Sequence, residues 1–358
     1  MTVPTSREAP RPRRGRLPLA AALLLIALAT LVPLGSGPPR SSPWFEWPDV
    51  LVNICLYLPL GLILARDGVR ITRLAALCAL VSGTIELLQA TVIPGRRGSP
   101  ADVVTNLAGA LAGFGLYSAA RHLRRSRVRG RLVAAGAVAA LPVCCWAVSG
   151  VLLGPSPPAT ESWWGQWAHR LTGMEQFRGS IVSVSFLGRP MPDNRLDSTG
   201  MLRDEARAGA LSLDITFLSG GITRGPTELA GVADGNGNFV ISLEQLGDDL
   251  LISWWSRGAA LGLHPPRVAI SGAVRAAPGE RLRLRASVTG SWVRTSVERA
   301  DSIHANALRL TPLIGWMNLI SAHEILAGAQ PLFNLLWMLG CVGYLILAVR
   351  VLRTFAGG

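Results

Sequence analysis

The sequence predicts a membrane α-helical bundle of about six transmembrane helices together with an extracytoplasmic all-β jelly-roll sandwich. Composition is the first reason: 49% of the 358 residues are hydrophobic, 16% are charged, and the mean hydropathy is +0.36. Such a chain is neither disordered nor a coiled coil. The second reason is pattern, because long apolar runs occupy the first 153 residues and the C-terminal end, whereas residues 155–330 carry short alternating runs.

Charge distribution is the third reason. The net charge is +13, yet residues 155–330 contain 16 Arg and 16 Asp or Glu and are neutral. The apolar remainder, with 19 basic and 6 acidic residues, therefore carries the whole excess. Basic residues confined to the apolar part of a chain favour anionic lipid as the partner, so we expect membrane lipids and no nucleic acid.

The spans follow the apolar runs in order. We expect a basic segment at 1–16, a bundle over 17–154, a sandwich over 155–312, a stalk or interfacial helix at 313–330, a C-terminal transmembrane helix at 331–350 and a tail at 351–358. Within the bundle, the spans lie near 17–34, 50–65, 74–93, 103–120 and 132–153. Several approach the roughly 20 residues that a helix needs to cross the hydrocarbon core.

Arginine positions orient the spans. If the N-terminus is cytoplasmic, the inner segments contain sixteen Arg and the short outer loops contain three, namely Arg40, Arg96 and Arg97. Because positive charge stays inside, we predict a multi-pass protein of the cell membrane with both termini cytoplasmic and the neutral sandwich extracytoplasmic.

Polar residues in three of the spans then converge near the outer face. A charge inside a span is costly and by default marks a site, and Glu86 lies about 10 Å below the end of its span at 1.5 Å per residue. The pocket candidates are Asp49, Asn53, Glu86, Gln89, Arg96, Arg97, Asp102 and Asn106. They predict a polar pocket shared by three helices.

Structural roles compete with this interpretation. Ser99, Pro100 and Asp102 form a helix-capping pattern, while Asn53 and Asn106 suit hydrogen bonds between helices. Small residues spaced by four along the fourth span favour close helix packing; they are Ala101, Thr105, Gly109 and Gly113.

Five motifs follow one another in this region: Asp49-Val-Leu-Val-Asn53, Leu58-Pro-Leu-Gly61, Ile85-Glu-Leu-Leu-Gln89, Arg96-Arg97 and Asp102-Val-Val-Thr-Asn106-Leu-Ala-Gly109. Together they resemble the VanZ-like family of bacterial membrane proteins. Their order and spacing are similar to the family's pattern over about residues 45–118. The family takes its name from a protein that lowers susceptibility to the glycopeptide teicoplanin, so the resemblance implies a role in the cell envelope and suggests glycopeptide resistance.

Three functions remain open. A carboxylate pocket beside an arginine pair could bind an envelope lipid, glycan or glycopeptide, with Arg96 and Arg97 on phosphate. A membrane enzyme acting on a lipid-linked phosphate or saccharide would use Glu86 as acid or base, but no nucleophile with its base is evident, and we expect a non-enzymatic protein. A scaffold for another envelope protein is the third. We expect no metal and no cofactor; the oligomeric state is open.

The sandwich prediction rests on eight runs. They are 181–187, 211–218, 228–233, 239–243, 250–256, 268–274, 282–288 and 293–298, separated by turn residues such as those of 234–238. Eight short strands with such turns predict a β-sandwich. Glu228-Leu-Ala-Gly-Val-Ala-Asp-Gly and Asn238-Phe-Val-Ile-Ser-Leu-Glu-Gln resemble the concanavalin A-like (laminin-G-type) jelly roll, which implies a lectin-like domain.

Aromatic residues are the sandwich's binding candidates. Trp254, Trp255 and Trp292 could stack on a lipid-linked or peptidoglycan-related glycan, although the consecutive pair points to opposite faces of a strand. Asp234 and the asparagines after it favour a hairpin turn over a calcium site. We interpret Trp163, Trp164 and Trp167 as an interfacial aromatic belt.

Overall fold

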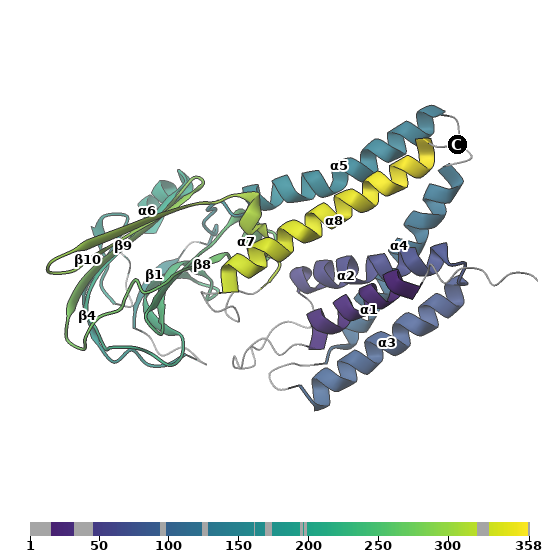
Figure 1. Cartoon of the computed structure of the whole chain (residues 1–358). Coiled ribbons are helices and arrows are strands. Elements are labelled where there is room, and N and C mark those ends of the chain that lie inside the picture. The colour runs from purple at the N-terminus through teal and green to yellow at the C-terminus, as the bar shows by residue number, and fades with distance from the viewer. Residues whose placement is uncertain are drawn as a thin grey trace, which may run out of the picture. The chain divides into compact units, whose positions relative to one another are not determined.

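The computed structural model describes residues 16–31, 46–93, 98–123, 128–160, 162–168, 174–193, 196, 199–320 and 329–356. The chain divides into two compact units (Figure 1). The first comprises residues 1–33 and 49–127, and the second comprises residues 34–48 and 128–358.

Helices make up the described part of the first unit. They are α1 (Arg16–Leu31), α2 (Trp47–Arg66), α3 (Ile71–Thr91) and α4 (Pro100–Leu123). Among the described residues, Trp47–Arg66, Ile71–Thr91 and Pro100–His122 are long and apolar enough to cross a membrane, and Pro18–Leu31, Ala140–Leu152 and Gln330–Ile346 are shorter apolar helices. Three candidate membrane helices are therefore confirmed.

Close backbone contact joins α2 to α4. A Cβ added at Gly109 would lie 2.5 Å from the Ile54 carbonyl oxygen, and one added at Gly113 would lie 2.1 Å from that of Leu58. Real side chains do not approach so closely, so only glycine fits at these positions. The predicted packing stripe along α4 is confirmed at both glycines.

Apolar side chains lie both inside and outside this unit. Tyr57, Leu74 and Ala110 are fully buried at its centre. Leu80 of α3 and Val104 of α4 are 68% and 66% exposed. Lipid is as apolar as leucine, so an apolar outer surface of this kind suits a helix surrounded by a bilayer.

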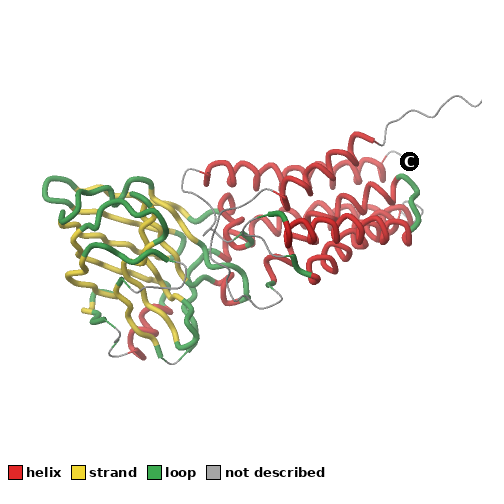
Figure 2. The backbone as a smooth tube through the Cα atoms, turned by 90° about the horizontal axis from the view of Figure 1, so that it is seen from below, coloured by secondary structure: helices red, strands yellow, loops and turns green. Residues whose placement is uncertain are grey.

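The second unit contains a two-sheet sandwich and several helices, and Figure 2 distinguishes its strands from its helices by colour. The helices are α5 (Val128–Leu152), α6 (Thr199–Arg207), α7 (Arg257–Ala260), the 3-10 helix η1 (Pro312–Asn318) and α8 (Gln330–Ala356). The strands are β1 (Trp163–Trp167), β2 (Ser180–Phe186), β3 (Arg189–Pro190), β4 (Ala210–Leu218), β5 (Thr227–Asp234), β6 (Phe239–Leu246), β7 (Asp249–Trp254), β8 (Arg267–Ile270), β9 (Arg281–Thr289), β10 (Trp292–Glu298) and β11 (Ile303–Arg309).

Both sheets are antiparallel throughout. One has five strands in the order β1-β5-β6-β7-β8, and the other has six in the order β11-β10-β9-β4-β2-β3. Along β9, buried residues such as Leu284 alternate with exposed arginines such as Arg283 and Arg285. This alternation gives the sheet one face toward the core. The predicted all-β sandwich is confirmed as two sheets.

The aromatic-belt interpretation was wrong for Trp163. This residue lies in β1, which pairs with β5, and it is 3% exposed. Its ring meets that of Phe186 edge-on, with 6.3 Å between the centroids. Trp167, in the same strand, donates from Nε1 to the Met191 carbonyl at 3.0 Å. The tryptophans of this segment therefore belong to an edge strand that contributes to the core.

Segment 313–330 begins as η1, and residues 321–328 lie outside the described part of the chain. Trp316 is 1% exposed within the hydrophobic core of the second unit and donates to Asn334 Oδ1 at 2.8 Å. Trp337 of α8 donates to the Pro312 carbonyl, also at 2.8 Å. These two indole hydrogen bonds join η1 to the first turns of α8.

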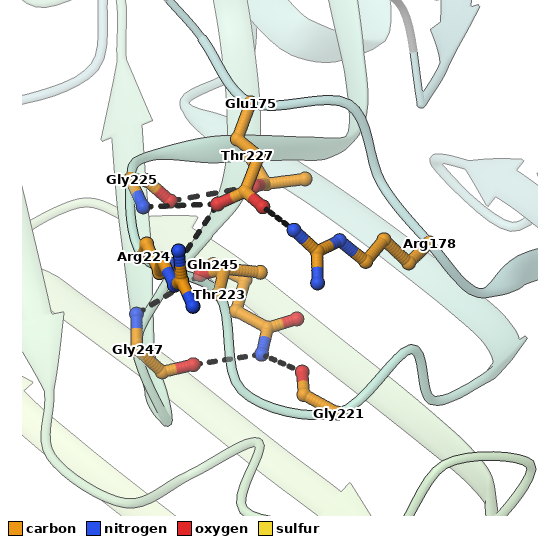
Figure 3. A network of polar contacts seen from close by, with 9 residues as sticks. All are labelled: Glu175, Arg178, Gly221, Thr223, Arg224, Gly225, Thr227, Gln245 and Gly247. Carbon is orange, nitrogen blue, oxygen red and sulfur yellow. Dashed lines mark hydrogen bonds and ion pairs between the residues drawn. The ribbon is translucent and has the colours of Figure 1, made fainter.

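A polar network fixes the loops beside β5 (Figure 3). Glu175 accepts hydrogen bonds from the backbone N–H groups of Arg224 (2.8 Å) and Gly225 (3.1 Å), and from Arg178 Nη2 at 2.6 Å. Gln245 Nε2 donates to the Gly221 and Gly247 carbonyls at 2.9 and 2.8 Å. Both side chains therefore make hydrogen bonds to backbone N–H or C=O groups in loops, outside the pairing of the strands.

Candidate functional site

The polar residues of the first unit gather at one end of its helices. Hydrogen bonds link the last turn of α1 to α3, the C-terminal part of α3 to the start of α4, and the start of α2 to α4. The convergence predicted from span orientation thus has a counterpart in the fold.

Glu86 lies where α4 begins. Its Oε2 accepts a hydrogen bond from the backbone N–H of Ser99 at 2.8 Å, and the Ser99 carbonyl accepts from Asp102 N at 3.0 Å. The first N–H groups of a helix lack intrahelical partners, and the helix dipole favours a negative charge there. Glu86 therefore binds the segment that leads into α4, and a Cβ at Gly98 would lie 2.4 Å from the Glu86 carbonyl oxygen.

Asn53 of α2 reaches the same turn of α4. Its Nδ2 donates to Thr105 Oγ1 at 3.1 Å, and Thr105 Oγ1 donates to the Asp102 carbonyl oxygen at 3.1 Å. Asn53 thus makes the interhelical hydrogen bond that the alternative interpretation predicted.

Asn106 lies deeper, between α4 and α3. It is 2% exposed, and its Nδ2 donates to Oγ of the fully buried Ser82 at 2.9 Å. Its Oδ1 is buried and has no hydrogen-bond partner among the residues that the structure describes. Buried amide oxygens are nearly always paired. If the Asn106 amide were flipped, its oxygen would face Ser82 and its nitrogen would be the atom without a partner.

Gln89 connects α3 to α1. It is 6% exposed, and its Nε2 donates to the Thr30 carbonyl oxygen at 2.8 Å. Thr30 Oγ1 in turn donates to the Ile26 carbonyl oxygen at 2.7 Å. An amide without hydrogen-bond partners is costly in hydrocarbon. The bond from Gln89 to Thr30 is therefore favoured, and it fixes the position of the two helices along each other.

For two of the remaining pocket candidates, the structure gives the position in the helix and the exposure. Asp49 is exposed in the first turn of α2, and Asp102 is half-buried in that of α4. Arg96 and Arg97 lie outside the described residues. Sequence reasoning did not single out Ser82 or Thr30. A serine or threonine that bonds to another helix and one that faces the surroundings have the same sequence pattern.

The tryptophan candidates differ in exposure. Trp254 is fully buried, and its Nε1 donates to the Leu153 carbonyl at 2.8 Å, so its ring belongs to the core. Trp255 is half-buried. Trp292 is 38% exposed, with the Arg294 guanidinium carbon 5.7 Å from its ring centroid. Trp292 is therefore the most accessible of the three for stacking.

Asp234 organises a turn, as the residue pattern favours. Its Oδ1 accepts from the backbone N–H groups of Asn236 (2.9 Å) and Asn238 (2.8 Å), and its Oδ2 accepts from Asn238 Nδ2 at 3.2 Å. Among the described residues, no group of three or more His, Cys, Asp or Glu could hold a metal ion.

A buried charged cluster in the sandwich escaped the sequence reasoning. Glu244 of β6 and Arg267 of β8 form an ion pair in which both side chains are under 5% exposed, and Ser242 Oγ donates to Glu244 Oε1 at 3.3 Å. Glu228 of β5, 1% exposed, is the cross-strand neighbour of Glu244. The partners are 16 to 23 residues apart in sequence, so no local motif reveals them.

Comparison with known proteins gives one match. Residues 7–121 match the VanZ/LLP1 family model. The predicted family resemblance is thereby confirmed over this part of the chain, which includes the whole polar end of α1–α4. No curated protein and no solved structure matches the chain.

Proposed function

We propose that this chain is a non-enzymatic membrane protein of the bacterial cell envelope whose first unit binds the polar part of an envelope lipid, glycan or glycopeptide. The family match supports an envelope membrane protein. The observation that carries the binding proposal is Asn106 Oδ1, a buried acceptor without a partner among the described residues, beside Glu86 and Asn53 at the same end of the unit.

The chemistry of this end suits a polar ligand. Carboxylate and amide groups offer acceptors and donors to sugar hydroxyls, and removing them from bulk water strengthens each hydrogen bond. Glu86 and Asn53 also hold helices together. Helices fixed in this way keep the ligand-facing groups in position, which reduces the entropy lost on binding.

The proposal includes a topology. The apolar helices α1–α5 and α8 would be the six spans, both termini would be cytoplasmic and the sandwich extracytoplasmic, as the arginine distribution indicates. The polar end would then face outward, on the same side of the membrane as the sandwich. A role in glycopeptide resistance follows from the family alone.

Glu86→Gln tests the binding proposal. The amide keeps an acceptor for Ser99 N–H but removes the charge, so we expect a change in teicoplanin susceptibility of the host at unchanged membrane abundance. Thr84→Val is the matched control on α3, because Thr84 is exposed and its hydroxyl donates only within its own helix, to the Leu80 carbonyl. Reduced abundance of Glu86→Gln would instead identify Glu86 as a structural cap and contradict the proposal.

A further inference from the structure

The two sheets of the sandwich leave a cleft along one side. Strand β8 ends the five-stranded sheet and β11 ends the six-stranded sheet. Two adjoining cavities, of about 430 and 350 Å³, lie between β8 with its following loop and the β10–β11 hairpin, and both are lined by Ser271 and Asn306. Ligand sites typically have a volume of this order.

Basic side chains line one cavity. Arg275, Arg299 and His304 line it, and its described lining includes no carboxylate. Arg275 is paired with Asp248 at 2.5 Å. Arg299 Nε is buried and has no hydrogen-bond partner among the described residues. A guanidinium nitrogen in that position is a donor suited to an oxyanion.

Exposed polar residues of the edge strand β11 also line this cavity. In the β10–β11 register, His304 is opposite Val297 and Asn306 is opposite Thr295, which is 6% exposed. Cross-strand pairing places these four positions on one side of the hairpin, where the β10 residues are buried and the β11 residues are exposed. His304 and Asn306 are therefore accessible to a ligand in the cleft.

The second cavity has large aliphatic side chains as well as polar residues in its lining. Val268 and Ile270 of β8 face Val293 and Leu308 of the other sheet across it. Gln330, the first residue of α8, also lines it. The second cavity therefore lies next to the start of a helix that we propose crosses the membrane.

We infer that this cleft binds an anionic lipid, with the phosphate or carboxylate of its headgroup at Arg299 and its acyl chain between β8 and β11. Basic side chains line the first cavity, aliphatic ones contribute to the second, and the two cavities share Ser271 and Asn306, so together they offer both chemistries of an amphiphile. A free anion would make no contact with the aliphatic side chains of the second cavity. An acyl chain bound there would lie beside Gln330, at the start of α8. This site differs from the polar end of α1–α4 and from the tryptophan candidates.

Photolabelling of the full chain tests the inference. The protein is placed in nanodiscs of phosphatidylcholine and exposed to lysophosphatidic acid that carries a diazirine in its acyl chain. We expect cross-links on β8 and on the β10–β11 hairpin. A lysophosphatidylcholine probe with the same chain should label these strands about fivefold less, because it lacks the net charge that Arg299 would bind.

Two variants and one control define the site. Arg299→Gln should reduce the labelling by lysophosphatidic acid about fivefold, and Ser271→Trp should block the mouth common to both cavities. Arg294→Gln removes an arginine from the outer side of β10, where it lies against Trp292, and should leave labelling unchanged. Melting temperatures of all three verify folding.

Three results would overturn the inference: equal labelling by both probes, equal loss in Arg294→Gln and Arg299→Gln, or full competition by millimolar inorganic phosphate. The last would identify a site for a free anion. Because the cross-links report the cleft itself, the outcome is independent of whether Glu86 and Asn106 bind a ligand.

Discussion

At the scale of single residues, buried charge is the most sensitive feature of the sandwich. Arg267→Met should lower its free energy of unfolding by about 3–5 kcal/mol, because Glu244 stays buried without the guanidinium. The double variant with Glu244→Leu should recover much of the loss, since a well-packed apolar pair can replace a buried ion pair. Thermal unfolding of the full chain in detergent measures both. An unchanged melting temperature in Arg267→Met would show that the pair contributes no stability.

Glu175 should make the stability of the same unit depend on pH. Hydrogen bonds from the Arg224 and Gly225 backbone N–H groups, aided by Arg178, lower the pKa of its carboxyl below the ordinary 4.5. A carboxyl with a lowered folded-state pKa stabilises the fold above its unfolded-state value, and this contribution disappears as pH falls through the folded-state pKa. Wild type should therefore exceed Glu175→Gln in melting temperature at pH 7, and the difference should be smaller at pH 3.

The control for this prediction is Glu205→Gln in α6, a half-exposed carboxylate that lies 4.0 Å from Arg189 Nη2. It should shift the melting temperature little at either pH, as exposed ion pairs contribute little. A Glu175→Gln difference that persists unchanged at pH 3 would mean that the side chain acts through shape and not through charge.

At the scale of secondary-structure elements, the α2–α4 contact can be tested with two glycines of one helix. Gly113→Ala places a methyl group 2.1 Å from the Leu58 carbonyl oxygen, so α4 must move away from α2, at a cost of about 1–3 kcal/mol. Gly115→Ala meets no atom within 4 Å and should be neutral or stabilising. Melting temperature and membrane abundance of the two variants give the comparison, and equal behaviour would refute close α2–α4 packing.

Elements with a strong periodic pattern were predictable, and those without one were not. The runs at 211–218 and 282–288 became β4 and β9 because alternating apolar residues face a single core. Strand β11 was missed: six of its seven residues are exposed, so its sequence carries no burial pattern. Strand β1 was missed because its aromatic residues are equally typical of a membrane interface.

The candidate site was predictable only in part, for a related reason. Antiparallel helices bring the end of α3 beside the start of α4, so Glu86 and Asp102 could be placed together from span order alone. Which hydroxyl Asn106 would find depends on the rotation of α3 about its axis, and a span that is apolar on every side does not fix that rotation. Ser82 therefore emerged only from the structure.

At the scale of the whole molecule, charge distribution leads to a prediction about topology. The turn between α2 and α3 lies among Arg66, Arg70 and Arg73, whereas the sandwich has no net excess of basic residues. If positive segments stay inside, a cysteine at Ala300, exposed in the β10–β11 turn, should react with an impermeant maleimide on intact cells. One at Asp67, exposed between α2 and α3, should react only after permeabilisation.

The five native cysteines all lie in helices, and replacing them with serine or alanine gives the background for both variants. Labelling at Asp67→Cys but not at Ala300→Cys on intact cells would invert the topology. The polar end of α1–α4 would then face the cytoplasm, because α2 starts at that end and the 66–70 turn lies at the other. An envelope ligand approaching from outside could not reach Glu86 or Asn106, so this one measurement decides whether the proposed binding function is geometrically open to the chain.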